Sequence, residues 1–318
     1  MNKFLICDLG AIETRVSAYL TQCPGLMEVF RLNRDPYLDL ASKMYNILYE
    51  VLQQDLKGTD KEKKALAKFY RQMAKPGILG AVYRLGGGGW GRNKYGDRIK
   101  TGLWGYAQNM GVNMTQEMAH KIVRMFREAY PEIPRFWKTL EINVREVLNP
   151  EVKNVKRYLG PVGGQVQMSK INIDGRYPLF RMRLPSGRML HYLDARMEET
   201  LMPWKDKQGE DVYRPALWYG GQDQVTKKWV SITSHGGKIM ENLVQGIARD
   251  VLAEKLILFQ ENDMDVVGHW HDEGAAVVPD DIFSPKVDKM IELMSLPVSW
   301  APGLILGADG MESPYYRK

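Results

Sequence analysis

Apolar positions along the chain follow two spacings, one typical of strands and one typical of helices. Residues 3–7 (KFLIC) are mostly apolar and predict a short buried strand. Residues 12–22 and 36–56 have apolar side chains every three or four positions, which predicts helices. The chain therefore opens with a strand that leads into a helical block.

Two further helices are predicted beyond residue 114. Thr115 is a suitable N-cap for the first, and Pro131 and Pro134 are expected to end it. Residues 136–147 repeat the helical spacing and predict the second. The helical block thus extends to about residue 150.

From about residue 155 the pattern changes to short strands with turn residues between them. Residues 180–193 and 216–232 each predict a strand pair. A long amphipathic helix is predicted over residues 237–260, and residues 266–278 predict a final hairpin. This order predicts an α+β chain in which a helical block is inserted into a sheet domain.

Composition narrows the class of protein only slightly. The 318 residues are 44% apolar and 26% charged, as in ordinary globular proteins, and they suffice for one elaborated domain or two lobes. The net charge of +6 favours a polyanionic partner, but only weakly. Cys7 and Cys23 are the two cysteines, and they have no metal-binding spacing. No apolar run approaches the ~18 residues of a membrane span, so we expect a soluble, cytoplasmic protein.

Two acidic residues follow predicted strands that are far apart in the sequence. Asp8 comes directly after residues 3–7, and Asp272 lies at the tip of the final hairpin between His271 and Glu273. Carboxylates at neighbouring strand ends can hold two Mg²⁺ ions about 3.5–4 Å apart. The alternative is that these acids are only solvated turn residues.

A second set of candidate residues recurs at intervals of four. Arg71, Lys75, Leu79 and Tyr83 would lie on one face of a helix, where two cations could bind a triphosphate and the other two side chains could pack against a base or sugar. The alternative is a solvated amphipathic helix, and Pro76 complicates a regular one.

Three segments resemble the motifs of family A DNA polymerases, which are similar to bacterial polymerase I. Residues 7–16 (CDLGAIETRV) resemble motif A, residues 71–86 (RQMAKPGILGAVYRLG) resemble motif B, and residues 268–278 (GHWHDEGAAVV) resemble motif C. Two intervening segments, 183–196 and 235–254, are similar to phage-encoded members. The resemblance implies a template-directed DNA polymerase with a palm sheet and an inserted helical fingers subdomain.

The resemblance also implies a division of the chain. Residues 1–40 would form the first part of the palm, and residues 41–155 the fingers with a motif B helix at 71–84. Residues 156–318 would form the second part of the palm, with the motif C hairpin at 265–279.

Roles follow from the matched positions. The implied metal ligands are Asp8, Leu9 through its carbonyl, Asp272 and Glu273. The implied nucleotide-binding residues are Arg71, Lys75, Leu79, Tyr83 and Glu13. The implied primer- and template-binding residues are His271, Gln245 and Arg15. Two Mg²⁺ ions, replaceable by Mn²⁺, would act with the catalytic residues Asp8, Asp272 and Lys75.

Individual positions refine this interpretation. Lys75 could donate a proton to the pyrophosphate, and Glu13 would lie under the sugar and reject a 2′-hydroxyl. Leu79 stands where bacterial members have an aromatic residue, Arg84 replaces a usual glycine, and Glu241 stands where many members have Asn.

The expected partners are primer-template DNA and dNTPs, without a membrane. Because motif A begins at Cys7, we expect a thumb and an exonuclease on a separate polypeptide, with a strand of that partner beside residues 3–7. Three alternatives remain. The chain could be a self-sufficient minimal enzyme or a DNA-binding remnant, or it could be a relative of single-subunit RNA polymerases. His269 and His271 with Asp272 or Glu273 could instead form a zinc site.

Overall fold

The computed structural model describes residues 2–92, 95–206, 208–223 and 225–317. The helices are α1 (Ile12–Thr21), α2 (Pro24–Arg31), α3 (Pro36–Tyr45), α4 (Tyr49–Lys57), α5 (Lys61–Ala81), α6 (Gly102–Asn109), α7 (Gln116–Ala129), α8 (Glu132–Leu148), α9 (Gly236–Gln260) and α10 (Val287–Ser295). The strands are β1 (Asn2–Leu9), β2 (Trp90–Arg92), β3 (Arg98–Lys100), β4 (Arg157–Leu159), β5 (Val166–Ile171), β6 (Leu179–Arg183), β7 (Met189–Lys205), β8 (Asp211–Gln222), β9 (Trp229–Ser234), β10 (Asp265–Trp270), β11 (Glu273–Pro279) and β12 (Ala308–Ser313). The α+β fold class is confirmed.

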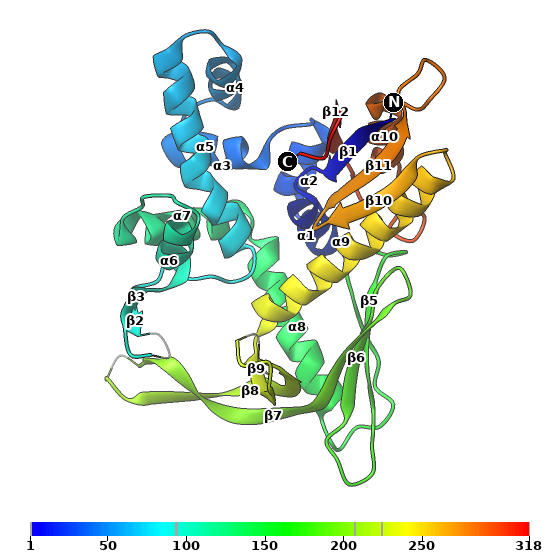
Figure 1. Ribbon diagram of the computed structural model, residues 1–318. Coiled ribbons are helices and arrows are strands. Elements are labelled where there is room, and N and C mark those ends of the chain that lie inside the picture. The colour runs from blue at the N-terminus through cyan, green and yellow to red at the C-terminus, as the bar shows by residue number, and fades with distance from the viewer. Residues whose placement is uncertain (1, 93–94, 207, 224, 318) are drawn as a thin grey trace.

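The smaller of the two main sheets combines the two ends of the chain. Its antiparallel strands follow the order β10-β11-β1-β12, so the first strand of the sequence lies in the middle (Figure 1). Gly274 and Gly310 lie opposite Cys7 on the two neighbouring strands. A side chain at Gly274 would collide with Leu256 of α9, and one at Gly310 with α10. These helices therefore cover the Cys7 face, and alternate residues of β1 point to the opposite face.

The central place of β1 corrects one expectation. We expected a strand of a separate polypeptide to pair beside residues 3–7. Both edges of β1 are already paired within this chain, one with β11 and the other with β12. The edge strands of this sheet are β10 and β12. The expectation was wrong because β12, which closes the second edge, was not identified from the sequence.

The helical block lies on the other side of the molecule and consists mainly of α3 to α7 (Figure 1). The helix expected over residues 36–56 is two helices, because Asn46 adopts a left-handed conformation with φ 52°. The motif B helix, expected over 71–84, is longer at its start and shorter at its end. It begins after the N-cap Asp60 and continues through Pro76 to Ala81. Tyr83 lies in the turn that follows.

The next two helices begin close to where the sequence indicated. The Thr115 side chain accepts a hydrogen bond from the Met118 backbone N–H and caps α7, as expected. Pro131 follows the end of α7, but Pro134 lies in the first turn of α8. Proline is tolerated there because the first backbone N–H groups of a helix have no intrahelical partner.

Residues 157–234 form a separate antiparallel sheet in the order β4-β5-β6-β7-β8-β9. Both predicted strand pairs are present in it, since β6 pairs with β7 and β8 with β9. One face packs on α8, and α9 runs between this sheet and the smaller one (Figure 1). The boundary predicted at residue 40 falls inside α3, which packs against α5. In the described residues, no helix is long and apolar enough to cross a bilayer.

Candidate active site

Four acidic side chains meet at one end of the smaller sheet. Asp8 lies directly opposite Glu273 on one neighbouring strand and opposite Asp309 on the other. Residues directly opposite each other in an antiparallel pair point to the same face. The backbone N–H of Leu9 donates to the Asp272 carbonyl at 3.1 Å, which brings the tip of the hairpin to the same place. The structure therefore brings Asp8 and Asp272 together, as the motifs indicated.

The proximity of these acids shifts the pKa of one of them. Partial burial raises the pKa of Asp8, and the negative charges of Asp272, Asp309 and Glu273 raise it further. Carboxylate oxygens gathered in this way are the kind of donor set that Mg²⁺ prefers. The residues present therefore fit a divalent metal ion.

Glu273 is held in place by an aromatic side chain. Its side chain is buried, and it accepts a hydrogen bond of 2.8 Å from the Tyr316 hydroxyl. The Tyr316 ring in turn lies 4.5 Å from the Trp270 ring, centroid to centroid. These contacts fix the carboxylate beside Asp8 and leave one of its oxygens available.

A preformed metal cage is absent from the part of the chain that the structure describes, since no group of three or more His, Cys, Asp or Glu side chains is arranged to hold an ion. The two histidines of the zinc alternative do not form one, and His269 instead lies 3.5 Å from the Arg249 guanidinium. Mg²⁺ commonly binds through one or two carboxylates together with substrate phosphates. A site completed by its substrate is consistent with this geometry.

A pocket of about 570 Å³ opens beside these acids. It lies between the start of α1, the end of α5 and the first turns of α9. Its lining residues are Ala11, Ile12, Glu13, Thr14, Tyr37, Leu79, Gly80, Tyr83, Leu85, Tyr106, His235, Lys238, Glu241, Gln245 and Asp272. The pocket thus contains residues from all three motifs.

Tyr83 and Glu13 form a pair on the pocket wall. The Tyr83 hydroxyl donates a hydrogen bond of 2.7 Å to Glu13. Burial, followed by the charge of Glu13, raises the pKa of Tyr83 far above its ordinary value, so the hydroxyl remains a donor. The start of α9 packs tightly here, because a Cβ at Gly237 would lie 2.3 Å from the Tyr83 carbonyl oxygen. The glycine is therefore required for this approach.

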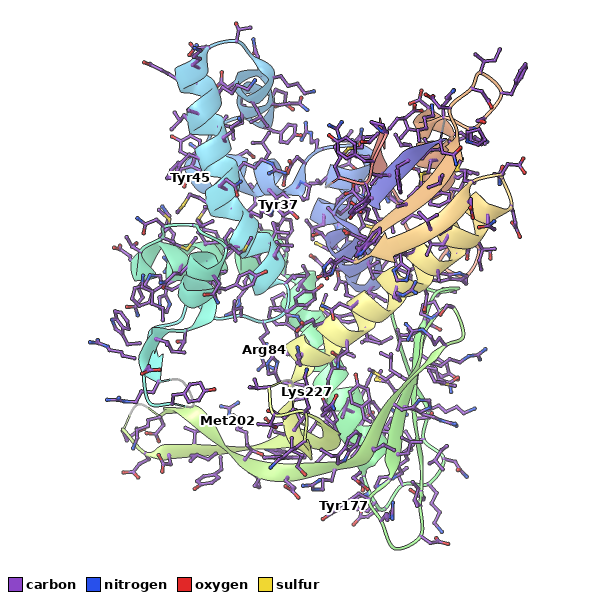
Figure 2. The ribbon with its side chains drawn as sticks, in the orientation of Figure 1. Tyr37, Tyr45, Arg84, Tyr177, Met202 and Lys227 are labelled. Atoms are coloured by element: carbon purple, nitrogen blue, oxygen red, sulfur yellow. The ribbon has the colours of Figure 1, made fainter. Side chains whose placement is uncertain are left out.

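The two cations of motif B lie next to the pocket and contact one of its walls. The Arg71 Nε donates to Asp35 at 2.6 Å, and its guanidinium lies 5.0 Å from the centroid of the Tyr37 ring. The Lys75 Nζ lies 5.8 Å from the same centroid. Burial and the nearby Asp35 raise the pKa of Tyr37 to about 12. Figure 2 shows Tyr37 between α5 and the smaller sheet.

The residues expected to contact primer or template have different environments. Gln245 and Asp272 line the pocket together, and His271 is exposed at the hairpin tip with φ 53°. Arg15 is buried instead. Its guanidinium donates to the carbonyls of Gly10 and Ile305, and burial lowers its pKa. This places Arg15 under the loop that follows Asp8, away from solvent.

Several residues of the site were not identified from the sequence. They are Asp35, Tyr37, Tyr106, Lys238 and Asp309. Asp309 could have been found by searching the segment ADGMES for a further strand that carries an acid. The others contribute through contacts distant in sequence, for which no local pattern exists.

The chain is similar to known DNA polymerases in sequence and in fold. No family model matches the chain. The DNA polymerase of Bacillus phage SP02 is 31% identical over all 318 residues, and the chain spans 41% of its length. The polymerase domain of Pol1 from M. smegmatis, in complex with DNA primer-template and dNTP, has a TM-score of 0.52 at 13% identity. That similarity covers 98% of this chain and 39% of the other. These findings confirm the resemblance to family A DNA polymerases: the chain is related to the phage enzyme and has the fold of a polymerase I polymerase domain.

Proposed function

We propose that the chain catalyses template-directed transfer of deoxynucleotides to the 3′-hydroxyl of a DNA primer. The observation that carries this proposal is the convergence of Asp8 and Asp272 beside a pocket that also contains the Tyr83 and Glu13 pair. The similarity to the phage DNA polymerase over the whole chain supports the same reaction.

The acids would act as metal ligands. Asp8, Asp272, the Leu9 carbonyl and Glu273 would hold two Mg²⁺ ions, which supply the positive charge that stabilises attacking and leaving oxygens. Glu273 keeps its position through Tyr316. Arg15 would keep the loop after Asp8 in place through the Gly10 carbonyl.

The motif B residues would bind the incoming nucleotide. Arg71 and Lys75 would contact the triphosphate, and Lys75 would donate a proton to the leaving pyrophosphate. Leu79 and Tyr83 would pack against the base and sugar from the pocket wall. Glu13, held by the Tyr83 hydroxyl, would occupy the space that a 2′-hydroxyl needs.

The primer and template would reach the pocket from the hairpin side. His271 is exposed at the hairpin tip, and Gln245 lines the pocket from α9. Both can donate hydrogen bonds to a nucleic acid strand. We assign them to the primer and template ends on this basis.

We also propose that a separate polypeptide supplies the thumb and the exonuclease. The chain spans only 41% of the phage polymerase, which leaves room for such parts. Because β1 is already paired on both sides, we now expect the partner at an edge strand, either β10 or β12. Exposed edges with unpaired backbone groups are suitable for this kind of contact.

The test is incorporation of one nucleotide into a primer by Asp272→Asn and by a control, Asp288→Asn, which changes an exposed acid on α10. We expect Asp272→Asn to abolish incorporation while DNA binding and folding persist, and the control to keep full activity. Turnover by Asp272→Asn would overturn the proposal.

A further inference from the structure

A second cavity, of about 670 Å³, lies between α8, the β7-β8-β9 strands and the start of α9. None of the roles proposed above uses it. Its walls are largely apolar, with Val144, Met197, Leu201, Leu217 and Ile239 among the lining side chains. Apolar walls of this kind can pack against the face of a nucleic acid base.

Arginines dominate the charge of this cavity. Arg84, Arg145 and Arg214 line it, and the one acid among its lining residues is Glu141. Glu141 is occupied, because it forms an ion pair with Arg84 and accepts the Gly236 backbone N–H at 2.9 Å. Arg145 and Arg214 are exposed and form no ion pair in the described part of the chain. The cavity therefore presents uncompensated positive charge.

An unsatisfied hydroxyl lies in the same wall. Ser234 is only 6% exposed, and its Oγ has no hydrogen-bond partner in the described residues. Buried polar atoms are rarely left in this state, because an unmade hydrogen bond costs free energy. The Oγ exposes less than 1 Å² to solvent, so a ligand in the cavity would reach it only if the wall shifted.

The second cavity adjoins the first. His235, the residue after Ser234, lines both cavities. Arg84 follows Tyr83, which lines the first cavity. Figure 2 shows Arg84 beside the start of α9, with Met202 below it on β7. A strand that reaches the nucleotide pocket could therefore continue directly into the second cavity.

We propose that this cavity binds unpaired nucleotides of the template strand. Arg145 and Arg214 would contact phosphates, and the apolar walls would pack against a base. The inference rests on the proposed function, because it assigns the template's single-stranded part to a place beside the same pocket. A free nucleotide has the same chemistry and is distinguished by the experiment.

The experiment measures affinity for primer-templates that differ only in the length of the 5′ template overhang, either one nucleotide or eight. The variant is Arg145→Gln with Arg214→Gln. The control is Arg124→Gln with Arg135→Gln, two exposed arginines on α7 and α8 that line neither cavity.

We expect the unaltered chain and the control to bind the long overhang more tightly than the short one. The variant should lose that gain. For the long overhang, the slope of log affinity against log salt concentration should become shallower by about 1.4, which is about 0.7 for each of two lost phosphate contacts. Affinity for the short overhang and single-nucleotide incorporation should remain unchanged.

Equal affinity of the unaltered chain for both overhangs would overturn this inference alone. So would a variant that keeps the gain. Binding of free, unpaired dATP that the variant loses while the overhang gain persists would mean that the cavity takes free nucleotides instead. Failure of the unaltered chain to incorporate on the short overhang, with the native-host protein fraction present, would instead overturn the proposed function, and this inference with it.

Discussion

The Asp8 carboxylate has three acidic neighbours, and this arrangement is costly without a cation. Partial burial and the charges of Asp272, Asp309 and Glu273 raise its pKa in the folded chain. The folded state therefore binds the Asp8 proton more tightly than the unfolded state does. It follows that ionisation of Asp8 destabilises the metal-free fold.

This linkage predicts the pH dependence of metal-free Asp8→Asn. The stability that wild-type Asp8 contributes is fully present below the ordinary aspartate pKa and is lost as pH rises through its raised value. We therefore expect Asp8→Asn to melt at a higher temperature than wild type at about pH 7, and the difference to shrink towards about pH 4. Thermal melts without divalent ions measure it.

The effect of added Mg²⁺ on the melting temperature tests whether Asp8 binds a metal ion. It should raise the melting temperature of the wild type at neutral pH and that of Asp8→Asn much less. The exposed Asp288→Asn should behave as the wild type. A wild-type melting temperature that does not respond to Mg²⁺ or Mn²⁺ would contradict a metal site at Asp8.

Glu13 is expected to control discrimination between deoxyribonucleotides and ribonucleotides. Glu13→Ala should reduce discrimination between dNTPs and NTPs by roughly tenfold or more, because the space under the sugar becomes open. Comparison of kcat/KM for the two substrates measures it. Glu62→Ala, at an exposed glutamate of α5, serves as the control. Unchanged discrimination would mean that another residue rejects the 2′-hydroxyl.

The sequence predicted the residues that lie within recognisable segments. Asp8 and Asp272 were found because the residues next to each in the sequence match a family motif. Asp309 was missed, since a single acid near the end of a chain acquires meaning only when β12 pairs with β1. Arg15 was placed in the right segment, but its guanidinium is buried and donates to the Ile305 carbonyl, which is distant in the sequence.

At the scale of elements, the position of α5 depends on one glycine. A Cβ at Gly77 would lie 2.6 Å from a methyl of the buried Ile122 on α7 and 3.2 Å from Leu40 on α3. The three helices pack closely here, and α5 carries Arg71 and Lys75. The spacing between helices therefore controls where the cations lie.

We predict that Gly77→Ala lowers the free energy of unfolding by about 1–3 kcal/mol, because α5 must move away from α7. The matched control is Gly86→Ala, where an added Cβ meets nothing within 4 Å. Urea denaturation of both variants measures the difference. Equal stability of the two would contradict the close packing of these helices.

Helix positions were predicted better than helix ends. The helical spacing of apolar residues over 36–56 continues across Asn46 without interruption. The backbone at Asn46 nevertheless adopts a left-handed conformation, which separates α3 from α4. An amphipathic pattern reports which side chains face the core, and two successive helices on one core can share it. The start of α5 was missed because its first turns are exposed and rich in lysine.

At the scale of the whole molecule, the site forms because strands from the end of the chain pair with its first strand. β1 receives β11 on one side and β12 on the other, both from the last 50 residues. The helical block and the β4-to-β9 sheet occupy most of the intervening sequence. The order of strands could not be predicted, because pairing between distant segments leaves no local periodicity.

The most direct measurement is primer extension by the purified chain with Mg²⁺ and one dNTP at a time, with and without a protein fraction from the native host. The account predicts incorporation of only the nucleotide complementary to the template, in at least one of the two arms, and its loss in Asp8→Asn. Stimulation by the fraction would support the separate polypeptide. Absence of templated incorporation in both arms, or incorporation that survives Asp8→Asn, would contradict the account.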